Sequence, residues 1–575
     1  MKKDGQSWDL KELNSQSIES AFKEIETKTK QIEHKKNLLT NNITNETFLD
    51  IVKEIENLRI TISHLTCFAS LRFAEDSSNQ RALAEMTAID NFITKIGNRL
   101  LFFSLWFKDL PESKSKELIR VSGKYAYYFE LIWKSRKYTL KENEEKIINI
   151  KNSTGISALN NIYNILTTQF SYQFRGKKIT QEELSNKVRN HSAQVRKEAY
   201  LTLLSKYKEN VNVIGEIYKN IINDWREEDI NLRGHDSPIQ VRNFANDIPD
   251  EAVEALLNIC EKNQHLFQKF FEIKRKKLGL KKMTRFDLYA NVEVKKEKNI
   301  SYTQGLQMVL DTYQEFSPRF KEAALKIVNS NHIHSQIQKN KQTGAFCCGI
   351  STKLPPFVLL NYTGTLRDVS TIAHELGHGV HYILASEQTE FTHDASLPLA
   401  ETASIFAEML LTEKMMKEDP TRAKELLYFK LEDIYASVIR QAGFVMFEKK
   451  AHEMIAEGKT IDELNTAYLS DLKKQLGSKV QVDPIFAYEW AYIPHIFHTP
   501  FYCYSYAFGN LLVLSLWEMY QEKGPSFAEK IIEMLAKGSS QSPIEITKAI
   551  GVDICSEEFW QKGFDVIERM IKEVE

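Results

Sequence analysis

The stretch that decides how this chain is interpreted spans residues 371 to 385 and reads TIAHELGHGVHYILA. It contains the pattern HExxH, formed by His374, Glu375 and His378. Residues four apart in a helix lie one turn apart on the same face, so both imidazoles can reach one metal ion while the glutamate lies beside them. A hydrolytic zinc site with an adjacent general base requires this arrangement.

The same stretch has the periodicity of a helix. Its apolar residues recur at spacings of four, four and three, at Ile372, Leu376, Val380 and Ile383. This spacing predicts a helix from about residue 369 to residue 385, with Asp368 as its N-cap. Until a third ligand is identified, a pair of histidines buried in an ordinary core stays an alternative interpretation.

The third metal ligand has to come from another position. A histidine ten residues after His374 would indicate a metzincin, but that position is Leu384. His381 lies about 10 Å from His374 along the helix axis, which is far for sharing one tetrahedral ion. We therefore expect His381 to line the pocket.

Glu401 is the better candidate for the third ligand. It interrupts the apolar stretch SLPLAETASIFAEML, in which Ser396 and Pro398 predict the start of the next helix. A carboxylate on an apolar face needs a charge partner, and a zinc ion would be one. Glu408 follows on the same face, where it can orient a ligand imidazole or be an ordinary surface glutamate.

A second group of polar aromatic residues lies in YIPHIFHTPFYCYSYAFG, residues 492 to 509. A hydrolytic zinc site needs donors for the oxyanion that forms when water attacks a carbonyl. The candidates for this role, or for lining the pocket, are His495, His498, Tyr502, Tyr504 and Tyr506. An aromatic-rich core helix is the alternative interpretation of the segment.

The position of a helix start separates these candidates. If Pro500 begins a helix, Tyr502 and Tyr506 share one face, while Tyr504 points toward packing residues. His495 then precedes the helix on an extended or turn segment. We expect the oxyanion donor to be Tyr502 or Tyr506, together with His495.

The composition predicts a mainly helical protein. Glycine and proline number only 22 and 13 in 575 residues, and apolar residues recur mostly at three- and four-residue spacing. Such a length exceeds one hydrophobic core, so we expect two or more packed lobes. Residues 343 to 365 contain two short runs rich in Val, Phe, Ile and Tyr, which predict a small β-sheet just before the histidine helix.

Charge and cysteine content exclude several classes of partner. The 76 basic residues are balanced by 77 acidic ones and are scattered among them, so we expect no nucleic-acid partner. The chain contains neither a bilayer-spanning apolar run nor an N-terminal signal pattern, which predicts a cytoplasmic protein without a membrane partner. Its six cysteines lack CxxC spacing, which argues against a disulfide framework and a Cys-ligated zinc. The oligomeric state has no signature in the sequence.

Three ordered motifs resemble the M3 family of zinc peptidases, in particular its oligoendopeptidase F branch. They are HELGHGVH (374 to 381), AETASIFAE (400 to 408) and PHIFHTPFYCYSYAFG (494 to 509). The resemblance implies a two-lobed helical shell around a deep substrate channel, with zinc on the channel floor and oligopeptides as substrates. It also suggests three segments: an N-terminal helical region (1–114), an oligoendopeptidase F-like helical segment (115–190) and a catalytic domain (191–575).

The resemblance implies a role for each candidate residue. Glu401 becomes the third zinc ligand and Glu375 the general base, while His495 and the tyrosines near 502 to 506 bind the substrate or the tetrahedral intermediate. The chain departs from some relatives at Cys503, where they carry tyrosine, which puts in doubt which tyrosine here stabilises the oxyanion.

These observations predict a zinc oligoendopeptidase with one Zn²⁺ per chain that cuts internal bonds of short, unfolded peptides. An exopeptidase of the dipeptidyl carboxypeptidase type is an alternative enzyme. A peptide-binding scaffold with an inactive metal site is an alternative from another class.

Overall fold

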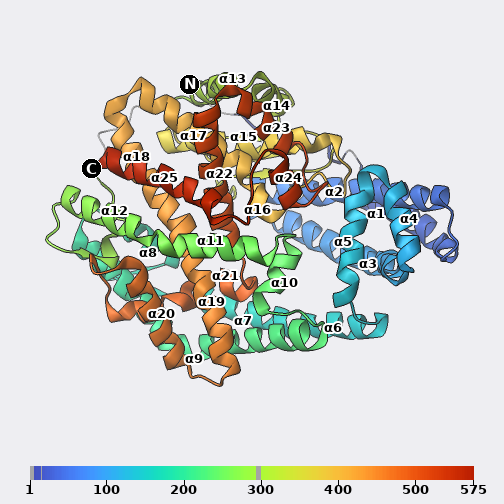
Figure 1. The fold of residues 1–575 in the computed structure, drawn as a ribbon, viewed down its shortest axis with the longest axis horizontal. Helices are drawn as coiled ribbons and strands as arrows, with labels where there is room; N and C mark the ends of the chain where they lie inside the picture. The colour runs from blue at the N-terminus through green and yellow to red at the C-terminus, as the bar shows by residue number, and fades with distance from the viewer. Residues whose placement is uncertain (1–5, 15, 293–298) are drawn as a thin grey trace. The chain divides into compact units, whose positions relative to one another are not determined.

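The computed structural model describes residues 6–14, 16–292 and 299–575, and helices dominate it (Figure 1). The chain divides into two compact units, each made of separate segments. Unit 1 comprises residues 1–136, 297–414 and 519–552, and unit 2 comprises residues 137–296, 415–518 and 553–575. The prediction of a mainly helical fold is confirmed, whereas the sequence segments 1–114, 115–190 and 191–575 stay a prediction.

Unit 1 contains the histidine helix and a small sheet. Its elements are α1 (Ile18–His34), α2 (Asn45–Glu75), α3 (Gln80–Asp109), α4 (Glu112–Val121), α5 (Ala126–Ser135), α13 (Tyr302–Phe316), α14 (Pro318–Asn329), β4 (Ile333–His334), β5 (Phe346–Cys348), β6 (Phe357–Leu359), α15 (Leu366–Leu384), α16 (Leu397–Ala400), most of α17 (Thr402–Glu418), α23 (Pro525–Leu535) and α24 (Pro543–Ala549).

Unit 2 contains the aromatic segment. Its elements are α6 (Glu142–Thr154), α7 (Ile156–Thr168), β1 (Tyr172–Phe174), β2 (Lys177–Ile179), α8 (Gln181–Lys187), α9 (Ala193–Trp225), the π-helix η4 (Arg226–Leu232), α10 (Pro238–Ala245), α11 (Asp250–Lys262), α12 (Gln264–Lys277), β3 (Met283–Thr284), α18 (Pro420–Ile434), the π-helix η7 (Tyr435–Ile439), α19 (Arg440–Ala456), α20 (Ile461–Leu476), β7 (Val480–Gln481), η8 (Pro484–Tyr492), α21 (His495–His498), most of α22 (Tyr504–Lys523) and α25 (Glu557–Val574).

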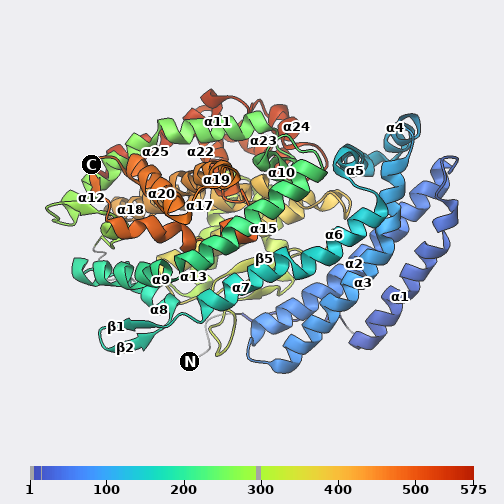
Figure 2. The same cartoon turned by 90° about the horizontal axis from the view of Figure 1, so that it is seen from below.

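The first three helices of unit 1 are long and lie side by side (Figure 2). Apolar side chains at helical spacing fill the space between them, among them Ile25, Leu58, Leu65, Ile89 and Ile96. Burial of such side chains is the main favourable term in folding, so this face explains why the helices associate.

A three-stranded sheet in unit 1 supports the histidine helix. Its strand order is β4-β6-β5, with β4 parallel and β5 antiparallel to β6. All three residues of β6 are buried, as expected for a central strand covered on both faces. The predicted sheet within residues 343–365 is confirmed, and it gains β4 from outside that range.

The histidine helix α15 begins three residues earlier than the sequence predicted. Thr365 is the N-cap, and its side chain accepts a hydrogen bond from the Asp368 N–H, while the Asp368 carboxylate accepts one from the Thr365 N–H. The predicted cap, Asp368, is therefore the inner partner of a capping box. The early start leaves the spacing of the histidines within the helix unchanged.

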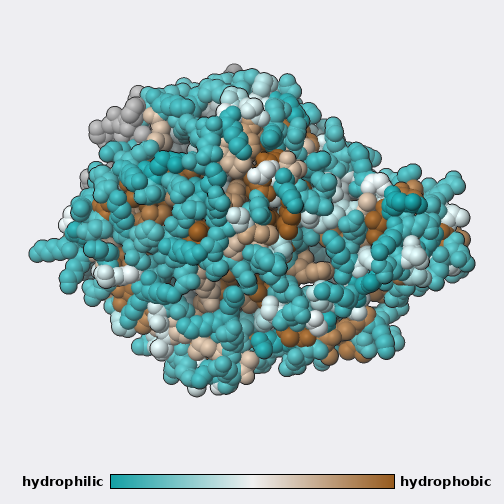
Figure 3. Space-filling view, in the orientation of Figure 1, coloured by the Kyte–Doolittle hydropathy of each residue, from teal (hydrophilic) through white to brown (hydrophobic). Residues whose placement is uncertain are grey.

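One face of the molecule is mainly polar. The face in Figure 3 is covered mostly by hydrophilic side chains, with hydrophobic ones scattered among them. None of the described helices combines the length and the apolar composition that crossing a bilayer requires.

Candidate active site

Three side chains of unit 1 converge on one point. His374 and His378 come from one face of α15, and Glu401 follows α16. The two Nε2 atoms are 3.2 Å apart, and Glu401 Oε2 lies 3.5 Å from His374 Nε2 and 3.3 Å from His378 Nε2. Among the described residues, this is the group of His, Cys, Asp and Glu side chains with the spacing to hold a metal ion.

The spacing of these donors suits a tetrahedral zinc ion. Bonds of about 2.0–2.2 Å to nitrogen and oxygen, at tetrahedral angles, would separate the donor atoms by about 3.3–3.6 Å. The three observed separations, 3.2, 3.3 and 3.5 Å, fall at or near this range. Three protein donors leave a fourth position for water or substrate, as catalytic zinc sites require.

Glu401 lies at a break between two helices. The sequence predicted one continuous helix here, but α16 ends at Ala400, Glu401 is its C-cap, and α17 begins at Thr402. The Ser404 hydroxyl donates a hydrogen bond of 2.9 Å to Glu401 Oε2, which fixes the carboxylate. The break directs Glu401 toward the histidines.

Glycine allows α15 and α17 to approach closely. A Cβ on Gly377 would lie 2.6 Å from the Cα of Ser404 and 2.8 Å from the carbonyl oxygen of Ala403. Both are backbone atoms, so a larger residue would force the two helices apart. Tyr313 supports α15 from another side, since its hydroxyl donates to the Ala373 carbonyl at 2.6 Å.

Glu408 contacts a candidate ligand directly. Its Oε1 lies 2.5 Å from His374 Nδ1, so the carboxylate can hold that nitrogen protonated and leave Nε2 free to face the other donors. The prediction that Glu408 orients an imidazole therefore has the required geometry. The alternative of an ordinary surface glutamate is wrong, because the side chain is partly buried against His374.

The electrostatics of the cluster favour positive charge. Burial lowers the pKa of His374, but the hydrogen bond to Glu408 and the nearby carboxylates outweigh it and raise the pKa to about 9. Burial raises the pKa of Glu401, but the hydrogen bond and charge of His378 outweigh it and lower the pKa to about 2. A divalent cation would satisfy the same excess of negative charge.

Glu375 has the properties of a general base. Its side chain is buried beside the trio, and burial raises its pKa above the usual value despite the neighbouring histidines. A carboxylate whose pKa moves toward neutrality accepts protons more effectively near neutral pH.

His381 is not part of the three-donor group. It is buried, lines the same cavity, and hydrogen bonds to the backbone of Ala400. Burial lowers its pKa to about 4, so the ring is neutral at pH 7. The hydrogen bond ties α15 to the end of α16, next to Glu401.

A cavity of about 440 Å³ opens beside the trio, and several of its lining residues were not expected from the sequence. These residues are Phe346, Cys347, Tyr382, His393 and Asp394. Tyr382 forms a hydrogen bond with His393, whose ring lies 3.4 Å from the Asp394 carboxylate. The adjacent His393 and Asp394, shortly before Glu401 in the sequence, were a local signal that could have indicated part of this lining.

The predicted oxyanion residues gather within unit 2. Tyr506 Oη and His495 Nε2 are 3.4 Å apart, and the rings of Tyr502 and Tyr506 pack edge to face at 5.2 Å. The helix predicted from Pro500 is wrong: α22 begins at Tyr504, and Tyr502 lies in the preceding turn. His495 lies in the short helix α21, not in an extended segment.

The other two candidates of this segment point elsewhere. Tyr504 is fully buried, and its hydroxyl accepts a hydrogen bond of 2.8 Å from Asn246, which agrees with its predicted packing role. His498 is exposed, and its Nε2 lies 2.9 Å from Asn164 Oδ1. Neither side chain has the position of Tyr506 beside His495.

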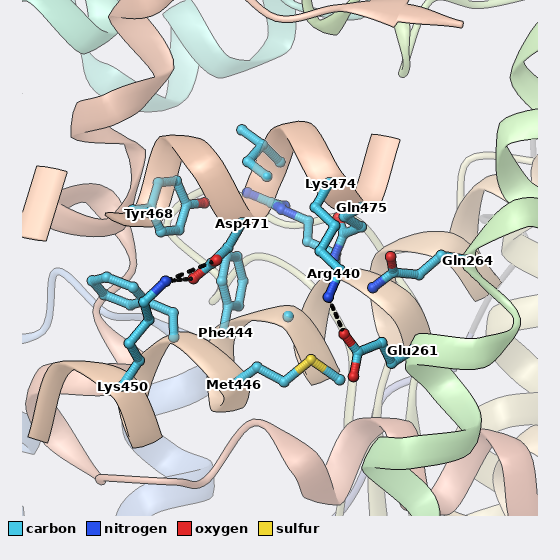
Figure 4. Close-up of a pocket in the computed structure, with 13 residues that line it drawn as sticks. Glu261, Gln264, Arg440, Phe444, Met446, Lys450, Tyr468, Asp471, Lys474 and Gln475 are labelled. Carbon is cyan, nitrogen blue, oxygen red and sulfur yellow. Dashed lines mark hydrogen bonds and ion pairs between the residues drawn. The ribbon is translucent and has the colours of Figure 1, made fainter. Parts of the chain in front are cut away.

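The surroundings of His495 favour its neutral form. Burial lowers its pKa, and the charges of His498 and Arg440 lower it further. Arg440 also lines a separate cavity of about 220 Å³ within unit 2 (Figure 4). The rim charges of that cavity are paired, Lys450 with Asp471 and Lys474 with Glu261, so we do not assign a catalytic role to it.

Comparison with known families decides the class of the protein. The sequence profile of Peptidase family M3 matches residues 188–566, more than half of the chain. The chain belongs to peptidase family M3. A second profile, Oligopeptidase F, matches residues 106–172. The resemblance seen in the three motifs is thereby confirmed, and this M3 protein is a peptidase.

Relatives of this M3 peptidase match it over almost its whole length. An "Oligoendopeptidase F homolog" of Borreliella burgdorferi is 26% identical, with 99% of this chain and 97% of the relative aligned. The "Oligopeptidase PepF" of Bacillus subtilis is 24% identical over 89% of this chain and 78% of its own length.

Solved structures share the fold of this M3 peptidase. The crystal structure of a putative peptidase from Chlamydophila abortus has a TM-score of 0.86 and 25% identity, covering 99% of this chain and 98% of its own. The oligoendopeptidase-F of Enterococcus faecium has a TM-score of 0.73 at 19% identity, covering 97% and 98%.

The contact at Gly377 gives a direct test of the site geometry. We expect Gly377→Ala to lower the free energy of unfolding by about 1–3 kcal/mol, since neither neighbouring backbone can move freely. It should also weaken Zn²⁺ binding, because α15 and α17 carry different donors. Thermal unfolding and elemental analysis of the purified protein measure both effects.

Gly379→Ala is the matched control. Its Cβ would meet the δ-methyl of Ile327 at 2.3 Å, and that methyl lies at the end of a flexible side chain that can rotate away. Zinc retained in Gly377→Ala but lost in Gly379→Ala would contradict the proposed helix contact.

Proposed function

We propose that this M3 peptidase is a zinc-dependent oligoendopeptidase that hydrolyses internal bonds of short, unstructured peptides. The observation that carries the proposal is the convergence of His374, His378 and Glu401 with Glu375 beside them. The names of the relatives, oligoendopeptidase F and oligopeptidase, support the peptide substrate and its limited size.

His374, His378 and Glu401 would hold the zinc ion, and Glu408 would keep His374 in the required tautomer. When bound, zinc supplies a Lewis acid that polarises the scissile carbonyl and acidifies a water molecule. The role of the protein is to fix the positions of the three donor side chains and the tautomer of His374.

Glu375 performs the proton transfers in this proposal. Its carboxylate accepts a proton from the attacking water and delivers it to the nitrogen of the leaving amine. The raised pKa makes Glu375 a stronger base than an ordinary glutamate, which favours uptake of the proton from water.

His495 and Tyr506 are proposed to stabilise the oxyanion, with Tyr502 packed against Tyr506. A neutral His495 can donate from one ring nitrogen, and the tyrosine hydroxyl is a second donor. Tyr504 is excluded from this role by its burial and its bond to Asn246.

The edge of the small sheet offers a binding mode for varied peptides. Within the described residues, β5 pairs with β6 on one side only, and its Phe346 and Cys347 line the cavity. An extended peptide can pair its backbone with such an edge whatever its side chains. The deep substrate channel expected from the family resemblance stays a prediction.

Metal and base can be separated by substitution. We expect Glu401→Ala to lose zinc together with activity, because one of three donors is gone. Glu375→Gln should keep about one zinc per chain and lose turnover, since only the proton carrier is removed. Elemental analysis and peptide cleavage assays distinguish the two.

His381→Ala serves as the control for the ligand set and should keep its zinc. Loss of zinc in His381→Ala with retention in Glu401→Ala would show that the ligands are assigned wrongly. Full activity of metal-free protein would contradict the zinc mechanism altogether.

The tyrosines make a second test. Tyr506→Phe should lower kcat by roughly a hundredfold while KM stays within about threefold, because an oxyanion bond forms mainly in the transition state. Tyr504→Phe should change kcat little. Steady-state kinetics on a quenched-fluorescence peptide measure both, and the reverse order of effects would refute the assignment.

Substrate type is tested with peptides blocked at both ends. An oligoendopeptidase should cut them, whereas an enzyme that anchors a free terminus should not, and mass spectrometry identifies the products. Efficient digestion of a stably folded domain under native conditions would contradict the restriction to short, unstructured peptides.

A further inference from the structure

The turn that carries Tyr502 has an unusual backbone. It joins α21 to α22, and its buried Phe501 has φ of +59°. A residue with a side chain rarely adopts this left-handed conformation, and it persists only where the surroundings impose it. The positions of Tyr502 and of Tyr506, in the first turn of α22, depend on what holds this turn.

Glu448 of α19 holds the turn from one side. Its Oε1 accepts a hydrogen bond of 2.8 Å from the Phe501 N–H, and its side chain is only 1% exposed. One helical turn later, the His452 ring packs against the Phe501 ring with centroids 4.8 Å apart. Phe501 is thus fixed through both its backbone and its side chain.

Helix α10 and the residue after it hold the turn from another side. Arg242 Nε donates a hydrogen bond of 3.1 Å to the Pro500 carbonyl. Asn246 donates to the Tyr504 hydroxyl at 2.8 Å, where α22 begins. Contacts from two helices distant in sequence therefore define the path of residues 500 to 504.

The carboxyl group of Glu448 is buried at a cost in free energy, which the hydrogen bond to the turn helps to explain. Its Oε2 is buried and finds no hydrogen-bond partner among the described residues, and burial raises its pKa to about 8. Burying a carboxyl group for one hydrogen bond is unfavourable compared with an apolar side chain of similar size. What the carboxyl group provides in return is an acceptor for the Phe501 N–H in its left-handed conformation.

We infer that Glu448 and Arg242 are positioning residues that hold the turn 499–503 so that Tyr502 and Tyr506 lie beside His495. The inference rests on the proposed oxyanion role of these residues. Neither Glu448 nor Arg242 touches the substrate in this account; both act through the turn.

Glu448 acts on the turn through its acceptor atom Oε1, not through a charge. Glu448→Gln keeps an acceptor oxygen and the volume of the side chain, so its kcat should stay within about threefold of the wild type. Glu448→Met removes the acceptor and should lower kcat by about tenfold or more, with KM within about threefold and zinc content unchanged. Rescue by glutamine separates positioning from a general loss of packing.

Glu453→Met is the matched control, because Glu453 lies on the exposed part of the same helix. It should leave kcat and the melting temperature unchanged. If Glu448→Met folds poorly, Arg242→Met removes the hold on Pro500 instead and should lower kcat in the same way. Unchanged kcat in both Glu448→Met and Arg242→Met would overturn the inference.

Two further measurements distinguish failure of the inference from failure of the proposed function. Combined with Tyr506→Phe, Glu448→Met should lower kcat little further, because both act on the same donor; multiplied effects would overturn the inference. Hydrogen–deuterium exchange of peptides covering residues 499–503 should be faster in Glu448→Met than in the wild type, and unchanged exchange would also overturn it. If Tyr506→Phe keeps full kcat, the oxyanion role fails, whereas faster exchange still supports the hold on the turn.

Discussion

The candidate site depends on the close approach of two helix backbones at Gly377. Because this position has no side chain, the backbone at Ser404 can lie where a Cβ would be only 2.6 Å away. The histidine donors come from α15, Glu401 from the break before α17, and Glu408 from α17 itself, so this one contact sets the distances between the histidines and these two carboxylates. Hydrogen bonds around the cluster then fix the orientation of side chains whose positions the backbones already determine.

The cluster also shows why a cation is the natural partner of this geometry. Three carboxylates, of Glu375, Glu401 and Glu408, lie around two imidazoles in a partly buried space. Bringing negative groups together away from water is unfavourable unless positive charge is present. The pKa of His374 is raised and that of Glu401 is lowered. Both shifts favour the charged forms, a protonated imidazole beside an ionised carboxylate. The group of His495, Tyr502 and Tyr506 within unit 2 has a different chemistry, because its members are aromatic side chains with N–H and O–H donors and no carboxylate.

Periodicity and motif spacing were sufficient to predict the helical fold, the small sheet and the convergence of the three donors. They failed where tertiary contacts decide the local structure. Asp368 is a good capping residue, and only the position of Thr365 three residues earlier makes it the inner partner of the cap. Pro500 is a good helix start, but the left-handed Phe501 that follows prevents a helix there. Its N–H donates a hydrogen bond to Glu448, 53 residues earlier in the chain, a contact that no local pattern could reveal.

The path of the chain through the two units has a consequence for any attempt to divide the protein. The chain passes from one unit to the other after residues 136, 296, 414, 518 and 552, so neither unit is a continuous segment. A single proteolytic cut leaves at least one unit assembled from two fragments, and a product truncated before residue 552 lacks parts of both. During synthesis, helix α2 emerges long before β6, whose Phe357 and Leu359 share a buried cluster with Leu71 and Ala74 of that helix. Folding of unit 1 therefore has to wait until much of unit 2 has left the ribosome.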